Sequence, residues 1–209
     1  MALIATEDVR CATCAHAFTV TVRRSIGPTE RPAVLADRLH HVACPACGQA
    51  LRHETPLTYL DPHTGDVVWV RPPEDEAGWS AWAHHASAGL AAVQRAGAWQ
   101  GPPARLRLVF GLDALREKLV VHAAGLDDAL VELVKRGIAL RRPRVADGLR
   151  VRAVTSTGLQ CVGPGTPGLV VPHAQYARLA AQRDALAAAW PALFAGPWVD
   201  AALLTRSRG

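Results

Sequence analysis

The sequence predicts an α+β fold: a zinc-ribbon-like antiparallel β module, a helical connection, and a mixed α/β C-terminal module. Two Cys-x-x-Cys pairs and a strand-like alternation of apolar and polar residues at 17–24 predict the first part. Apolar residues recur at helical spacing between residues 112 and 138 and predict helices there. We therefore expect a zinc-ribbon-like module at 1–72, a helical linker at 73–104 and a mixed α+β module at 105–209.

In the first module, residues 17–24 place Phe18, Val20 and Val22 on one face, which is typical of a half-buried strand. Pro32 is suited to the first position of a short helix. A second strand is expected at 50–54. A hairpin is expected from strands at 57–60 and 67–70, because residues 61–65 (Asp-Pro-His-Thr-Gly) are all favoured in turns.

After the Pro72-Pro73 boundary, we expect a helix over 79–99 and a strand over 105–110. Two amphipathic helices should follow, the second with Asp127 as its N-cap and with Glu132 and Arg136 paired on its surface. Strands are expected at 149–155, 159–162 and 169–171, and a helix at about 174–190. Cys161 lies in one of these apolar strands and is expected to be buried as a small hydrophobic residue.

Four cysteines form the main candidate site: Cys11, Cys14, Cys44 and Cys47, with 29 residues between the two pairs. Each Cys-x-x-Cys brings two sulfurs to one side of a turn, and two such turns can complete the tetrahedron of thiolates that structural Zn²⁺ accepts. In the second turn, Pro45 fixes φ and Gly48 permits a positive φ. The first turn has neither residue, and His16 beside it is expected to be an exposed polar residue rather than a substitute ligand.

Other readings of the four cysteines remain open. A Cys-x-x-Cys pair can be redox-active, and four thiolates can hold an iron–sulfur cluster. The spacer of 29 residues is longer than the commoner 15–20, and an inserted strand and helix would explain it. A catalytic zinc is disfavoured, because such sites keep one of their four positions open. The pattern favours one structural Zn²⁺.

These motifs resemble the bacterial CpXC domain family, whose domain is zinc-ribbon-like. The resemblance rests on Cys11-x-x-Cys14, on Cys44-Pro-Ala-Cys-Gly, and on the Pro-Leu-Thr-Tyr-Leu-Asp segment at 56–61. It continues more weakly through residues 115–118, 125–128 and 132–135. Ala12 departs from the family pattern, which has proline there. The resemblance implies a metal site and a fold, and it names no substrate.

The overall charge is +5 and is unevenly distributed. Residues 1–72 are balanced, whereas residues 101–209 carry fifteen basic and eight acidic side chains, an excess of +7. The densest basic cluster comprises Lys135, Arg136, Arg141, Arg142 and Arg144. It is either a solvated helix end or a nucleic-acid surface. Binding of a single strand would favour aromatic residues interleaved with the cluster, and the cluster has none.

The remaining polar groups have simpler readings. His40-His41 and His84-His85 are adjacent pairs, and we expect no shared metal there, because adjacent residues on a helix face different directions. His122 is expected to be a core histidine. Asp127-Asp128 is expected to cap a helix rather than to act in acid–base catalysis.

We expect a non-enzymatic protein, because no nucleophile motif or phosphate loop is present. The first hypothesis is an interaction or adaptor module that binds another protein through the hairpin at 57–70 and the tryptophan-bearing segment at 79–99. The second is a nucleic-acid-associated regulator that uses the basic C-terminal half. The residues show no signal peptide and no apolar stretch long enough for a membrane, so a cytoplasmic location is expected.

Overall fold

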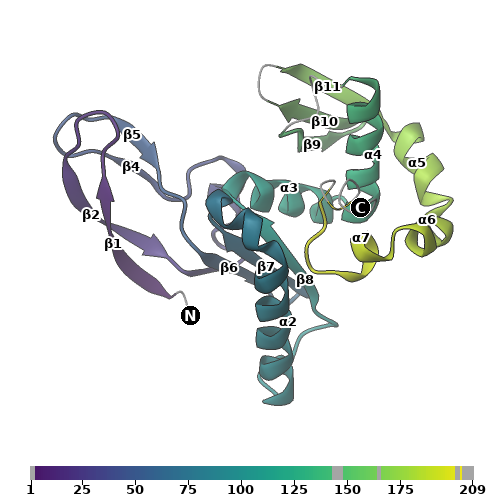
Figure 1. The fold of residues 1–209 in the computed structure, drawn as a ribbon, viewed down its shortest axis with the longest axis horizontal. Helices are drawn as coiled ribbons and strands as arrows, with labels where there is room; N and C mark the ends of the chain where they lie inside the picture. Colours follow the sequence, from purple (N-terminus) through teal and green to yellow (C-terminus); the bar gives the residue numbers. More distant parts are fainter. Residues whose placement is uncertain (1–2, 143–147, 164–165, 201–202, 204–209) are drawn as a thin grey trace. The chain divides into compact units, whose positions relative to one another are not determined.

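The computed structural model describes residues 3–142, 148–163, 166–200 and 203. The chain is mixed α+β, as the sequence predicts (Figure 1). Its contacts group into two compact units, Met1–Leu112 and Asp113–Gly209. The boundaries expected at residues 72 and 104 both fall within the first unit.

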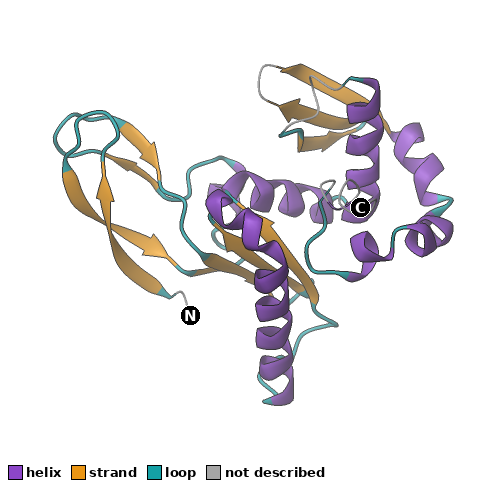
Figure 2. Cartoon of the chain, in the orientation of Figure 1, coloured by secondary structure: helices purple, strands orange, loops and turns teal. Residues whose placement is uncertain are grey.

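The first unit begins with two separate antiparallel hairpins. Strands β1 (Ile4–Arg10) and β2 (Ala17–Arg23) form one, and β4 (His41–Ala43) and β5 (Ala50–Arg52) form the other. The buried Val20 and Val22 on β2 confirm the alternation seen in the sequence. Strand β1 was not predicted. The loops at the two hairpin tips carry the two cysteine pairs (Figure 2).

A four-stranded sheet with the order β3-β6-β7-β8 follows in the same unit. Its strands are β3 (Ser25–Ile26), β6 (Leu57–Asp61), β7 (Asp66–Arg71) and β8 (Arg105–Phe110). The predicted hairpin is confirmed: Asp61 Oδ1 accepts the N–H of His63 at 3.0 Å, and Gly65 adopts a φ of 81°. A Cβ at Gly65 would lie 2.7 Å from the carbonyl oxygen of Pro103, so this position needs glycine.

Helix α2 (Trp79–Arg95) follows a 3-10 helix, η1 (Pro73–Gly78), and packs on one face of this sheet (Figure 1). Gly89 allows the close approach, since a Cβ there would lie 3.1 Å from the Trp69 ring. The helix ends before the predicted residue 99. Gly97, with a φ of 66°, ends it, and the N–H of Ala98 bonds back to the carbonyl of Val93. Helix α1 (Arg31–Leu35) is the short helix expected near Pro32.

The second unit packs two helices against a three-stranded antiparallel sheet with the order β11-β10-β9. The helices are α3 (Leu112–Ala123) and α4 (Asp128–Arg141), and the strands are β9 (Arg150–Thr155), β10 (Gly158–Gly163) and β11 (Thr166–Pro172). Asp127 caps α4 as predicted, because its Oδ1 accepts the Ala129 N–H at 2.9 Å. Val134, Val151 and Cys161 are among the buried residues of the core.

The helix predicted over 174–190 is instead two helices, α5 (His173–Ala180) and α6 (Arg183–Ala189), and α7 (Pro191–Ala195) follows. Gln182, the N-cap residue of α6, makes no side-chain capping hydrogen bond at the break. At the start of α6, Arg183 Nε donates to Asp127 Oδ2 at 2.8 Å. None of the helices in the described part of the chain is long and apolar enough to cross a membrane.

Candidate functional site: a four-cysteine centre

The four predicted cysteines lie together. One potential ligand atom from each of Cys11, Cys14, Cys44 and Cys47 lies within 4.8 Å of the others. The sulfurs of Cys11 and Cys47 are 3.7 Å apart, as are those of Cys14 and Cys44. A tetrahedral zinc with bonds of about 2.3 Å has sulfur–sulfur edges of about 3.8 Å. The sulfurs are therefore spaced to hold one small metal ion, and they are too far apart for disulfides.

The backbone forms the same turn at both pairs. The carbonyl of Cys11 accepts the N–H of Ala15 at 2.8 Å, and the carbonyl of Cys44 accepts the N–H of Gly48 at 2.8 Å. Both turns end on a residue with positive φ, 59° at Ala15 and 72° at Gly48. Alanine in this region is strained, whereas glycine is not. The first turn therefore reaches the geometry of the second without its proline or its glycine.

The thiols of the cluster influence one another strongly. The backbone N–H groups of Cys14 and Thr13 hold the pKa of Cys11 down to about 6, although burial opposes this. The backbone N–H of Gln49 lowers the pKa of Cys47, but the neighbouring cysteine sulfurs outweigh it and raise that pKa to about 12. Four thiolates cannot share this space without a cation. Metal binding here should therefore release protons.

Behind the hairpins, a polar cluster joins β1 to the segment after β5. Glu7 accepts hydrogen bonds from Thr55 Oγ1 at 2.7 Å, pairs with His53 Nε2 at 2.7 Å, and pairs with Arg24 at 2.6 Å. Burial raises the pKa of Glu7, but these partners outweigh it and leave the pKa lowered. His40 is buried nearby, and its Nε2 accepts the Arg23 N–H at 3.0 Å. Burial lowers the pKa of His40 to about 4, so this histidine is neutral at pH 7.

The other histidines lie elsewhere. The His16 ring stacks on Phe18 with a centroid distance of 6.1 Å, and the metal-ligand group found among the described residues contains cysteines only. His41 is exposed and faces Asp37 at 3.7 Å, away from His40. On α2, the His85 ring lies 6.4 Å from that of Trp82.

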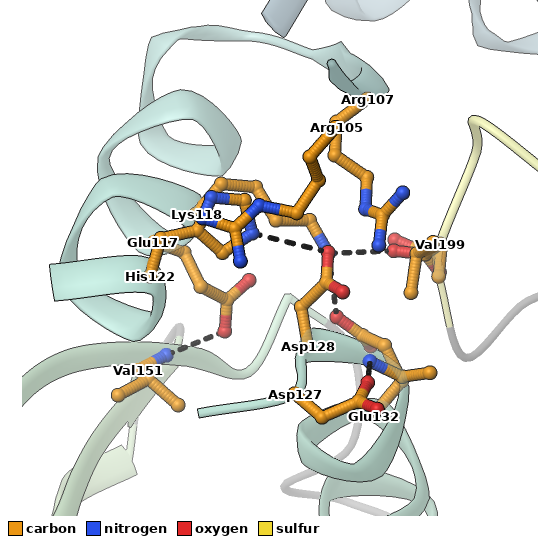
Figure 3. A network of polar contacts seen from close by, with 12 residues as sticks. Arg105, Arg107, Glu117, Lys118, His122, Asp127, Asp128, Glu132, Val151 and Val199 are labelled. Atoms are coloured by element: carbon orange, nitrogen blue, oxygen red, sulfur yellow. Dashed lines mark hydrogen bonds and ion pairs between the residues drawn. The ribbon is translucent and has the colours of Figure 1, made fainter. Parts of the chain in front are cut away.

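A second constellation, in the other unit, was not predicted: a buried network of charges (Figure 3). Lys135 pairs with Glu117 at 3.0 Å and with Glu132 at 2.8 Å. Lys118 pairs with Asp128 at 3.2 Å and lies 3.6 Å from Glu132. All five side chains are at most 6% exposed. Glu132 is therefore a buried residue, and not the surface residue expected from its spacing to Arg136.

Glu117 connects this network to the edge of the sheet. Its Oε1 accepts the Val151 N–H on β9 at 2.7 Å (Figure 3). Arg150 donates to its Oε2 at 3.2 Å. Burial raises the pKa of Glu117, but Lys135 and Arg150 outweigh it, and the carboxylate stays ionised with a lowered pKa. For Glu132 burial dominates, and its pKa is raised. Buried charges are tolerated here because each is paired.

The structure also places other residues that the sequence analysis singled out in this unit. His122 is a buried histidine with its Nε2 3.6 Å from Asp128 Oδ2, as expected of a core position. Cys161 is buried, as predicted, and burial raises the pKa of its thiol to about 11. Lys135 does not contribute to the predicted basic surface cluster, because it is buried within the network. Arg141 and Arg142 are exposed, and Arg144 lies outside the described residues.

One comparison with known proteins agrees with the cysteine pattern. A family model described as CpXC protein matches residues 9–135, which include all four cysteines and the network residues Glu117, Lys118, Asp128, Glu132 and Lys135. The comparisons with curated proteins and with solved structures found no match.

The two turns allow a matched test of backbone strain. Ala15→Gly should stabilise the first unit by about 1 kcal/mol, because it relieves a positive φ, and Gly48→Ala should destabilise it by about the same amount. Nothing lies within 4 Å of a Cβ at Gly48, so that substitution introduces only the backbone term. Urea unfolding of both variants measures the two shifts. Equal signs for the two changes would contradict the shared turn geometry.

Glu117→Gln tests the buried network. The amide keeps an acceptor for the Val151 N–H but removes the charge that compensates Lys135 and Arg150. We expect a loss of about 3–5 kcal/mol in the unfolding free energy of the second unit. Asp184→Asn is the control, because this carboxylate on α6 is fully exposed and should leave the urea midpoint unchanged. Equal midpoints for the two variants would show that the network contributes nothing.

Proposed function

Because the chain belongs to the CpXC protein family, we propose that it is a non-enzymatic zinc-binding protein whose four clustered cysteines hold one structural Zn²⁺. The spacing of the four sulfurs carries this proposal. Four thiolates fill the tetrahedral coordination of zinc and leave no position for a reactive water. The metal would therefore hold the two hairpins together and take no part in a reaction.

The same geometry favours zinc over the alternatives. A cluster of several irons and sulfides between the thiolates would hold the cysteines farther apart than 4.8 Å. A redox pair would require a disulfide within one turn, whereas the 3.7 Å contacts join cysteines from different turns. Two turns at the tips of two hairpins also support a zinc-ribbon-like arrangement. A reducing compartment such as the cytoplasm would keep the thiols available for the metal.

We further propose that the first unit acts as an interaction module. The sheet and α2 form an apolar groove of about 840 Å³. Its walls include Trp69 on β7, Leu90 on α2 and Trp99 after α2. Leu90 and Trp99 belong to the tryptophan-bearing segment at 79–99 that the adaptor hypothesis names, and Trp69 belongs to its hairpin. Aromatic residues in a groove are typical anchors for a protein partner.

The rim of the groove favours a protein segment over a small molecule. Leu3, Leu60 and Val93 line the groove and are 63%, 36% and 42% exposed. Apolar side chains around the mouth would remain in water if only the interior were filled. A peptide with apolar side chains would cover both the interior and the rim.

A nucleic-acid-associated role is the alternative, and the structure supports it less. The basic cluster loses Lys135 to the buried network. Arg141 and Arg142 remain exposed at the end of α4, where cations also suit the helix dipole.

Metal content tests the zinc assignment. The purified protein should contain about one zinc per chain, and Cys44→Ser or Cys47→Ser should lose the metal and unfold the two hairpins. Elemental analysis with circular dichroism measures both effects. Cys161→Ala is the control, because that thiol lies in the core of the other unit, and it should keep its zinc. Full metal content in both serine variants would refute the proposal.

The groove is tested by capture of partners from the native cell. Val93→Glu should abolish capture, because it places a charge on the apolar rim, and the fold should persist since Val93 is 42% exposed. Leu140→Glu is a matched change at an exposed leucine on α4 and should have no effect. If both variants retain the same partners as the wild type, the groove is not the docking surface.

A further inference from the structure

A separate pocket lies in the second unit, beside the first turn of α3 and the strands β9 and β10. It has a volume of about 290 Å³. Among the described residues that line it, three are arginines (Arg116, Arg150 and Arg152) and one, Asp113, is a carboxylate. The cysteine cluster and the apolar groove are both in the other unit. The charge of the lining points to an anionic ligand.

Strand β9 contributes two of the arginines, Arg150 and Arg152, to the lining of this pocket. The pairing of β9 with β10 shifts register between them, because Val151 pairs with Cys161 and Ala153 pairs with Gln160, so Arg152 lies at a β-bulge. Bulges redirect side chains, and both arginines here reach the same pocket. Gly148 and Gly163 also line the pocket and have no side chains to fill it. The pocket is therefore open to a ligand of small size, with two arginines of one strand beside it.

Two of the arginines are held in place by carboxylates. Arg150 is fixed by Glu117 Oε2 at 3.2 Å and by Asp200 Oδ2 at 3.6 Å. Arg116 is 4% exposed and pairs with Asp113 Oδ1 at 3.3 Å. A guanidinium has five N–H donors, and both contacts of Arg150 are made by Nη1, so these two carboxylates leave its Nε and Nη2 donors unused. Arginines positioned in this way lose little entropy when an anion binds.

Arg152 differs from the other two. Its side chain is exposed, and no ion pair within the described part of the chain holds it. It lines the same pocket as Arg150, whose charge Glu117 and Asp200 offset. An anion bound beside Arg152 would pair with its charge and accept paired hydrogen bonds.

We propose that this pocket binds the phosphate group of a small phosphorylated ligand. Guanidinium groups match the geometry of phosphate oxygens through paired hydrogen bonds. The volume lies at the small end of ligand pockets, which suits a phosphate-bearing molecule of limited size. None of the described residues that line the pocket is aromatic, so none of them can stack a base. A small phosphorylated molecule therefore fits better than a nucleic-acid strand.

Calorimetric titration of the full metal-loaded chain with inorganic pyrophosphate tests the proposal. The wild type should bind, and Arg152→Ala should weaken binding about tenfold or more, as expected for the loss of a charged, paired contact. Arg152→Lys should fall between the two, because it keeps the charge but loses the paired geometry. Arg178→Ala removes an exposed arginine from α5 and should bind like the wild type.

Three results would overturn the assignment: no heat of binding at millimolar pyrophosphate, equal binding by Arg152→Ala and Arg178→Ala, or a tighter oligonucleotide complex that pyrophosphate does not displace. The last would assign the arginines to a nucleic-acid backbone. Circular dichroism of the variants checks their fold, which should be unchanged because Arg152 is exposed. The test is independent of the zinc proposal, since Cys44→Ser alters the other unit.

Discussion

The first unit depends on one constraint: four sulfurs must share a volume in which each lies within 4.8 Å of the others. The two hairpins belong to separate two-stranded sheets, and such hairpins are marginal alone. Their tips are brought together at the cysteines, and Glu7 joins β1 to the segment after β5 on the inner side. Without a cation the sulfurs would repel when ionised. The proposed metal would offset this repulsion and hold the tips of the two hairpins together.

Strong local patterns predicted the elements that they mark. The alternation of Val20 and Val22, the turn at Asp61 and the N-cap Asp127 each have one physical cause within a few residues, and each was confirmed. Strand β1 has no such pattern, because Glu7 and Asp8 interrupt it. Glu7 points inward only because Arg24, His53 and Thr55, all distant in sequence, satisfy its charge. A single sequence does not reveal that kind of compensation.

The same limit applies to the two candidate sites. The cysteine centre was predictable, since spacing alone identifies two turns that can share a metal. The charge network was hidden, because Glu132 and Arg136 at four residues apart look like an ordinary surface pair. Burial of Glu132 depends on Lys118 from another helix and on Lys135 from its own. The five network residues of α3 and α4 are therefore part of the buried interior of the second unit.

The network reaches beyond residue 135, the end of the family match, through the side chain of Arg150 and through two backbone atoms. Glu117 accepts the main-chain N–H of Val151, and Lys118 donates to the main-chain carbonyl of Val199 at 2.8 Å. Every residue has a main-chain carbonyl, and every residue except proline has a main-chain N–H. The side chains at positions 151 and 199 can therefore change without removing these partners. Two helices can in this way keep a fixed set of charges while the segments that complete their unit diverge in sequence.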